Sequence, residues 1–126
     1  MKLSLQLTGN KFNIYAIIKD DGSIPVLDYL DQLKTNDPPS FKSLLNLLKM
    51  HADHGPIKNA FKSRPIKGYN NLFEFKSKQG GRILYCYLPR GITVLIDGFP
   101  KGTPTKELFK NADEIKDQLE RTQKNG

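Results

Sequence analysis

Three basic residues stand at the ends of predicted strands, where a rigid scaffold can present them to a phosphate. Lys76 closes one strand, Arg82 opens the next after the turn Gln79-Gly80-Gly81, and Lys101 follows the last strand. A guanidinium group can bind two phosphate oxygens at once and keeps its charge at any working pH. Residues of this type in these positions indicate a cationic surface that binds a phosphate group.

Positive charge is concentrated in the same part of the chain. Between Lys58 and Lys106 there are ten Lys or Arg residues and two acidic residues, Glu74 and Asp97, whereas the remainder has ten basic and eleven acidic residues. This uneven distribution favours a polyanionic partner such as nucleic acid over membrane lipid, which usually requires an amphipathic basic helix or an anchor. The alternative is that these lysines only keep a sheet soluble.

Length and composition predict one ordinary globular domain over residues 1–126. The chain has 37% hydrophobic and 26% charged residues, which argues against extensive disorder. It contains no apolar run of about 18 residues, and its first residues lack the apolar core of a signal peptide, so we expect a cytoplasmic protein with no membrane contact. The only cysteine, Cys86, lies in an apolar run and is predicted to be buried.

Apolar and β-branched runs predict four strands. The first covers residues 12–18, and three more at 72–76, 82–88 and 92–97 are separated by glycine-containing turns, as in an antiparallel meander. Both alternating faces of the strand at 82–88 are mainly apolar, which predicts a central position in the sheet.

Three helices complete the predicted order. Ser23 is predicted to cap a helix with Pro25 in its first turn, and this helix ends before the run Asn36-Asp37-Pro38-Pro39. A second helix follows and stops at Gly55-Pro56, and a last one begins after Thr103. The order is β-α-α-β-β-β-α, an α+β domain whose helical hairpin packs on a small, mainly antiparallel sheet.

This order, together with the stretches GYNNLFEFKSKQGGRILYCY and ITVLIDGFPKGTPTKE, resembles the RelE/HigB-like toxin superfamily of bacterial toxin–antitoxin systems. The phage-derived HigB-like branch is the most similar. The resemblance covers nearly the whole chain, but it rests on a strand, a glycine turn, an arginine and the pattern GF-x-K rather than on an invariant catalytic signature. It implies a RelE-like fold and an mRNA interferase, a ribosome-dependent endoribonuclease that inhibits translation without a metal or other cofactor.

The resemblance also implies partners. These are mRNA, the ribosome and a neighbouring helix-turn-helix antitoxin of the HigA-like kind, with operator DNA bound only through the toxin–antitoxin complex. The competing hypothesis is a non-catalytic module of the same fold that binds RNA or an antitoxin without cutting.

Four residues are candidates for catalysis. Arg82 matches the family's strand arginine that contacts the scissile phosphate, and Lys101 falls where many relatives place a second basic residue that stabilises charge in the transition state. Lys76 is a further phosphate contact, or a general acid or base if neighbouring cations lower its pKa. Glu74 stands where some relatives carry a catalytic lysine, and is either a general base for the 2′-hydroxyl or an ion-pair partner of Lys76 and Arg82.

The spacing also predicts how these residues are placed. If the turn after Lys76 closes symmetrically, Lys76 lies opposite Arg82 and Glu74 lies opposite Leu84, so all three charged side chains share one face. A tight turn after strand 82–88 would place Asp97 opposite Arg82 as well.

Further basic residues are predicted to bind RNA: Lys78, Lys106, Lys67 and Arg64. Lys106 falls in the first turn of the last helix, where free backbone N–H groups favour an anion. His51 and His54 have a spacing that can bind metal, but no acidic or cysteine cluster accompanies them, so no metal site is predicted. No His or Tyr falls between Lys101 and Lys110, which leaves the proton donor to the leaving oxygen unassigned.

Overall fold

The computed structural model describes the backbone of residues 1–125 and the side chains of residues 1–122. The strands are β1 (Lys2–Thr8), β2 (Asn13–Ile18), β3 (Ser63–Pro65), β4 (Phe73–Lys76), β5 (Gly81–Leu88) and β6 (Ile92–Pro100). The helices are α1 (Pro25–Asn36), α2 (Pro38–His54) and α3 (Lys106–Asn125). The predicted class is confirmed, because these elements form one α+β domain.

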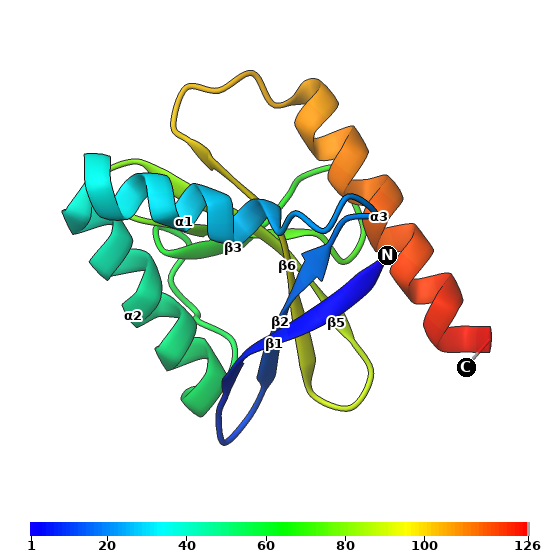
Figure 1. The fold of residues 1–126 in the computed structure, drawn as a ribbon. Coiled ribbons are helices and arrows are strands. Elements are labelled where there is room, and N and C mark those ends of the chain that lie inside the picture. Colours follow the sequence, from blue (N-terminus) through cyan, green and yellow to red (C-terminus); the bar gives the residue numbers. More distant parts are fainter. Residues whose placement is uncertain (126) are drawn as a thin grey trace.

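The strands form a six-stranded sheet in the order β1-β2-β6-β5-β4-β3. Only β2 and β6 run parallel, and the other neighbours are antiparallel. Figure 1 shows α1 and α2 on one side of the sheet and α3 on the other. The sheet therefore has a separate apolar core on each face.

The predicted order of elements is wrong at two places, because it lacks β1 and β3. In β1, Leu3, Leu5 and Leu7 alternate with polar residues, which is the usual pattern of a half-buried strand. β3 has only three residues and no apolar pattern, and it exists because it pairs with β4 at the sheet edge. The first of these strands could have been read from the sequence, and the second could not.

β5 lies near the middle of the sheet and is buried on both faces, as predicted. Ile83 and Tyr85 belong to the core under α1 and α2, whereas Leu84 and Cys86 belong to the core under α3. Cys86 is fully buried, and this burial raises the pKa of its thiol to about 12. A strand packed on both sides cannot slip by one residue without turning every side chain to the wrong core.

The helical hairpin has a short joint. Asp37 alone separates α1 from α2, and its carboxylate caps α2 by accepting a hydrogen bond from the Ser40 backbone N–H at 3.3 Å. The predicted cap of α1 is wrong, because Ile24 occupies that position and the Ser23 hydroxyl donates to Asp21 at 2.6 Å instead. No helix in the described part of the chain has the length and apolarity that crossing a membrane requires.

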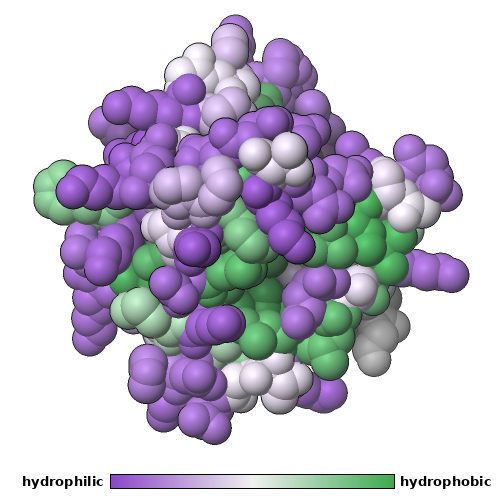
Figure 2. Space-filling model, turned by 60° about the vertical axis from the view of Figure 1, so that its left-hand side comes forward, coloured by the Kyte–Doolittle hydropathy of each residue, from purple (hydrophilic) through white to green (hydrophobic). Residues whose placement is uncertain are grey.

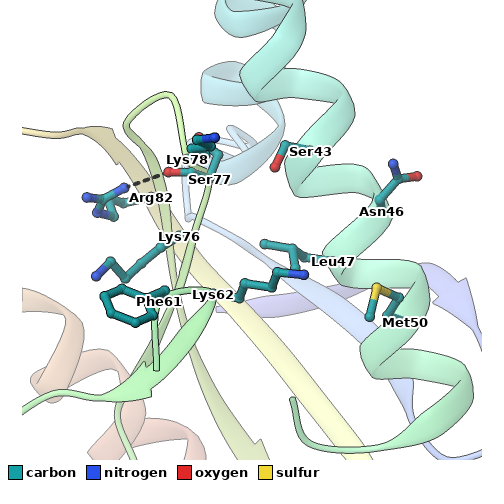
Figure 3. A pocket seen from close by; sticks show the side chains of 10 residues that line it. All are labelled: Ser43, Asn46, Leu47, Met50, Phe61, Lys62, Lys76, Ser77, Lys78 and Arg82. Atoms are coloured by element: carbon teal, nitrogen blue, oxygen red, sulfur yellow. Dashed lines mark hydrogen bonds between the residues drawn. The ribbon is translucent and has the colours of Figure 1, made fainter. Parts of the chain in front are cut away.

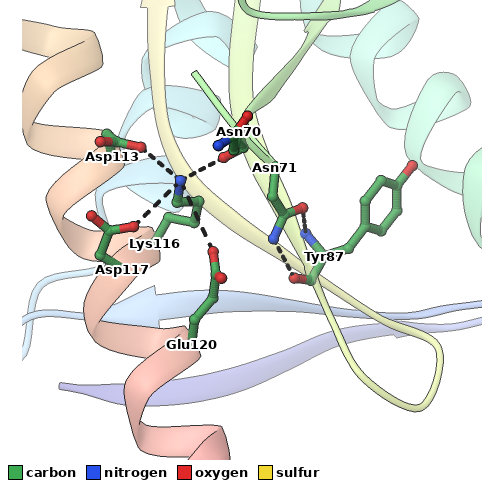
Figure 4. A network of polar contacts seen from close by, with 7 residues as sticks. All are labelled: Asn70, Asn71, Tyr87, Asp113, Lys116, Asp117 and Glu120. Atoms are coloured by element: carbon green, nitrogen blue, oxygen red, sulfur yellow. Dashed lines mark hydrogen bonds and ion pairs between the residues drawn. The ribbon is translucent and has the colours of Figure 1, made fainter. Parts of the chain in front are cut away.

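α3 is held to the sheet by a buried lysine. The Lys116 ammonium group donates to Asp113 at 2.7 Å and to the backbone carbonyl of Asn70, and Asp117 lies within ion-pair distance (Figure 4). Burial alone would lower the pKa of Lys116, but the hydrogen bonds and charges of Asp113 and Asp117 outweigh it and raise that pKa. This contact ties α3 to the loop before β4.

The same loop is fixed from its other side. The Asn71 side chain donates to the Tyr87 carbonyl at 2.8 Å and accepts from the Tyr87 N–H at 3.0 Å (Figure 4). The side-chain amide of Asn71 therefore makes the two hydrogen bonds to the backbone of β5 that a neighbouring strand would make, just before β4 begins. Lys116 and Asn71 together set where β4 enters the sheet.

His51 lies in the last turn of α2, but its side chain is buried in the core and does not reach solvent. Its Nε2 lies 2.9 Å from the Thr93 hydroxyl, and its ring stacks on Phe12 with centroids 4.7 Å apart. Burial lowers the pKa of His51 to about 4. The histidine is consequently neutral in the folded protein down to mildly acidic pH.

Replacing Lys116 by Ala should destabilise the protein by about 1–3 kcal/mol. The substitution leaves the Asn70 carbonyl without its hydrogen-bond donor and removes the cation that lies among the carboxylates of Asp113, Asp117 and Glu120. The loss should lie toward the lower end because those carboxylates reach solvent. Urea unfolding measures it. Lys110→Ala, at an exposed position on the same helix, should change stability by under about 0.5 kcal/mol, and an equal loss in both variants would contradict the account.

Stability should fall as the pH is lowered from 6.5 toward 4, because His51 takes up a proton in the unfolded chain before it does so in the folded one. The maximum effect is about 3 kcal/mol. Unfolding curves at several pH values should show that the free energy of unfolding falls less steeply with acidification in His51→Gln than in the wild type. His54→Gln, which changes an exposed histidine on the same helix, should keep the wild-type dependence.

Candidate functional site

The β4–β5 hairpin brings Lys76 and Arg82 together. Lys76 pairs with Arg82 and Glu74 with Leu84, which confirms the symmetric register predicted from the sequence. The turn is closed by a bond from the Ser77 N–H to the Gly81 carbonyl at 2.8 Å, and Gly80 adopts a left-handed φ of 116°. Such a backbone angle favours glycine, so the turn chemistry fixes the register.

Asp97 does not face Arg82, contrary to the prediction. The β5–β6 turn is one residue longer than assumed and a bulge follows Leu84, so Arg82 pairs with Phe99 and Leu84 with Asp97. The Asp97 carboxylate accepts from the Gly98 N–H at 2.8 Å, and burial raises the pKa of Asp97. Among the described side chains, no carboxylate lies within ion-pair distance of Arg82.

Arg82 is half-buried and is oriented by the turn. Its Nη1 donates to the Ser77 carbonyl at 3.2 Å and to the Gly81 carbonyl at 3.1 Å. These bonds restrict the guanidinium group without neutralising its charge. The group therefore remains able to bind an anion with its other N–H donors.

Lys76 lies at the centre of a cationic cluster, which we define as Arg64, Lys76, Arg82 and Lys101. Its pKa is lowered by partial desolvation and by the charges of Arg64, Arg82 and Lys101, while Glu74 acts in the opposite direction. Lys101 is joined to the hairpin by a bond from its backbone N–H to the Gly80 carbonyl at 2.7 Å. Three segments thus place like charges around one amine.

Glu74 is engaged with Arg64 rather than with Lys76 or Arg82. Its carboxylate accepts from Arg64 Nε at 2.7 Å, and the Glu74 side chain is 3% exposed, against 54% for Arg64. The ion-pair partner expected from the sequence is therefore wrong. A buried carboxylate that already holds a guanidinium group is poorly placed to take a proton from a ligand in the solvent, and its ion pair restrains Arg64.

A groove of about 740 Å³, here called the α2 groove, lies beside the cationic cluster. Its lining is Ser43, Asn46, Leu47, Met50, Phe61, Lys62, Lys76, Ser77, Lys78 and Arg82. In Figure 3 the side chains of α2 lie on one side, and those of Lys76 and Arg82 on the other. Because Lys76 and Arg82 belong to both, the groove and the cluster form one continuous surface.

Apolar side chains gather on this side of the molecule. Figure 2, turned so that the left side of Figure 1 with α2 comes forward, shows them in a hollow surrounded by hydrophilic residues. The α2 groove itself combines the apolar side chains of Leu47, Met50 and Phe61 with basic side chains, so a ligand with an apolar surface and negative charge would fit it.

The other predicted RNA contacts are more dispersed. Lys78 lines the α2 groove. Lys67 lies at the turn before β4, and Lys106 is the first residue of α3. Both are exposed, and neither lines the groove. The structure thus groups Lys78 and Arg64 with the candidate catalytic residues and leaves Lys67 and Lys106 outside the groove.

Sequence reasoning missed one side of the groove entirely. Phe61 and Lys62 lie in an irregular segment, and Ser43, Asn46 and Met50 are on the polar side of α2. For Phe61 and Lys62 the sequence offers one signal, which is an aromatic residue next to a lysine in a basic segment. For the α2 residues the sequence offers no signal, because their proximity to the hairpin arises from packing.

The two histidines lie in different surroundings. His51 is buried against Thr93 and His54 is exposed. In the part of the chain whose side chains are described, no group of three or more His, Cys, Asp or Glu is placed to hold a metal ion.

Comparison with models of known protein families and with curated proteins gives no match for this chain. The resemblance to the RelE/HigB-like superfamily accordingly stays a prediction from the residues, and the site has to be interpreted from its own geometry.

Proposed function

We propose that this chain is an mRNA endoribonuclease, acting on ribosome-bound messages as the toxin of a toxin–antitoxin pair. The observation that carries the proposal is the position of Lys76 among Arg64, Arg82 and Lys101 beside an open groove. Clustering like charges is unfavourable unless an anion joins them. Successive phosphates of a bound RNA strand would supply such anions for Arg64, Arg82 and Lys101.

The proposed reaction is an attack of a ribose 2′-oxygen on the adjacent phosphorus. The bond to the 5′-oxygen breaks as the new bond forms, which leaves a 2′,3′-cyclic phosphate, and the departing 5′-oxygen takes up a proton from water. Negative charge builds up on the phosphoryl oxygens in between. Arg82 is held by the turn so that its free N–H groups meet these oxygens, and Lys101 adds a second charge. Arg64, oriented by Glu74, is placed to bind a neighbouring phosphate.

Lys76 is the residue best suited to take the proton from the 2′-hydroxyl. A lysine is a base only when neutral, and the lowered pKa of Lys76 favours the neutral form. Glu74, the other candidate in the predicted site, is engaged with Arg64. We therefore assign the base to Lys76 and a positioning role to Glu74.

The proposed partners follow from the same charges. An antitoxin that inhibits this site must cover the cationic cluster, and an acidic or helical segment would be complementary to it. We expect this antitoxin to be a helix-turn-helix protein of the HigA-like kind, and operator DNA to be bound through it. The proposed cytoplasmic location is where ribosomes and mRNA are found.

Replacing Arg82 by Ala should reduce cleavage of a ribosome-bound message by about 10²- to 10³-fold, the usual loss when one donor to a transition-state oxyanion is removed. Growth arrest on induction of the chain should be relieved in parallel. Arg121→Ala, at an exposed position on α3, is the matched control and should stay toxic. Full toxicity of a folded Arg82→Ala protein would disprove the assignment.

Lys76→Arg keeps the positive charge but removes the titratable base. In the wild type the cleavage rate should rise with pH toward the lowered pKa of Lys76, since the neutral amine is the active form. The variant should lose this rise and be slower by about 10²-fold or more. Single-turnover rates across pH measure both effects, and Lys110→Arg should reproduce the wild-type profile; a retained rise in Lys76→Arg would exclude Lys76 as the base.

The second candidate is a binding module that blocks translation without cutting. The burial of Glu74 favours it, because this residue is the one carboxylate among the predicted site residues and its side chain is 3% exposed. Primer extension on a ribosome-bound message separates the two functions. New RNA ends that depend on Arg82 support the nuclease, whereas inhibition without new ends supports the binder.

A further inference from the structure

Phe61 presents an apolar ring to solvent, and the local backbone keeps it there. The residue is 85% exposed, although large aromatic side chains are usually mostly buried. The Asn59 side chain accepts from the Phe61 N–H at 2.9 Å, and the Asn59 carbonyl accepts from the N–H groups of Lys62 and Ser63, both at 2.9 Å. Since Ser63 begins β3, these hydrogen bonds attach the backbone that carries the ring to the sheet edge.

The surroundings of Phe61 combine apolar surface with positive charge. Met50, itself 43% exposed, and Leu47 line the α2 groove together with Phe61. Lys62 and Lys78 line it as well, and Lys76 connects the groove to the cationic cluster (Figure 3). A flat apolar ring flanked by lysines is the combination that binds an unpaired nucleotide, whose base stacks while its phosphates meet the charges.

We propose that the α2 groove binds an unpaired nucleotide next to the cleaved bond, with its base stacked on Phe61 and a flanking phosphate on Lys62. The inference rests on the proposed nuclease function and specifies its substrate as single-stranded RNA. A duplex would not satisfy this site, because its base faces are covered by their neighbours. A strand lying across Lys76 and Arg82 continues into the groove, since both residues line it.

The test measures binding separately from cleavage. A short fluorescent RNA carrying 2′-O-methyl groups throughout cannot be cut by 2′-oxygen attack, so anisotropy reports its affinity for the full chain. Phe61→Ala should weaken binding by about 5- to 150-fold, the range that loss of one base–aromatic stack produces. Phe61→Trp should restore it, and Leu5→Ala, which trims another exposed apolar side chain, should leave it unchanged.

An abasic series identifies the stacked nucleotide. The same RNA is prepared with one base omitted at each position in turn, and each version is titrated against wild type and Phe61→Ala. At the stacked position the omission and the substitution should be non-additive, because both remove the same contact. At other positions their effects should add.

The outcomes separate this inference from the proposed function. Loss of affinity in Phe61→Ala with coupling to one base supports the inference, even if the protein proves unable to cut RNA. Unchanged affinity overturns it, whether or not cleavage is intact. It is likewise overturned if Phe61→Ala impairs only association with the neighbouring gene's protein, because the groove then binds a polypeptide.

Discussion

The pairing of β5 with β4 on one side and β6 on the other is the constraint on which the rest of the structure depends. β5 is buried on both faces, so its register is fixed by two cores at once. That register sets Lys76 beside Arg82. The backbone hydrogen bond from the Lys101 N–H to the Gly80 carbonyl joins the end of β6 to the same turn. The positions of the cations are therefore a consequence of apolar packing.

Holding these cations together opposes folding, and the sheet supplies the stability that permits it. Lys76 responds by a lowered pKa, and Arg64 is partly compensated by the buried Glu74. Arg82 is restrained through backbone carbonyls, which orient it and leave its charge intact. A preorganised cationic surface of this kind favours the binding of an anion, and it suits the phosphoryl chemistry that we propose.

The opposite edge of the site depends on a second set of contacts. Lys116 and Asn71 fix the loop before β4 from α3 and from β5. The β3 segment that follows Phe61-Lys62 pairs with β4 in turn. The α2 groove consequently lies between elements that are each attached to the central sheet, although they come from distant parts of the chain.

The sequence by itself determined the central strand, the helical hairpin, the buried Cys86 and the pairing of Lys76 with Arg82, because alternation and a glycine turn encode these locally. The alternation of β1 is also present in the sequence. Only the tertiary structure decided that Glu74 binds Arg64, that a longer turn and a bulge move Asp97 away from Arg82, and that α2 and Phe61 line a groove with the hairpin. These three features depend on the pairing of strands and the packing of helices. The sequence does not reveal them, because contacts between distant segments leave no periodic pattern in a single sequence.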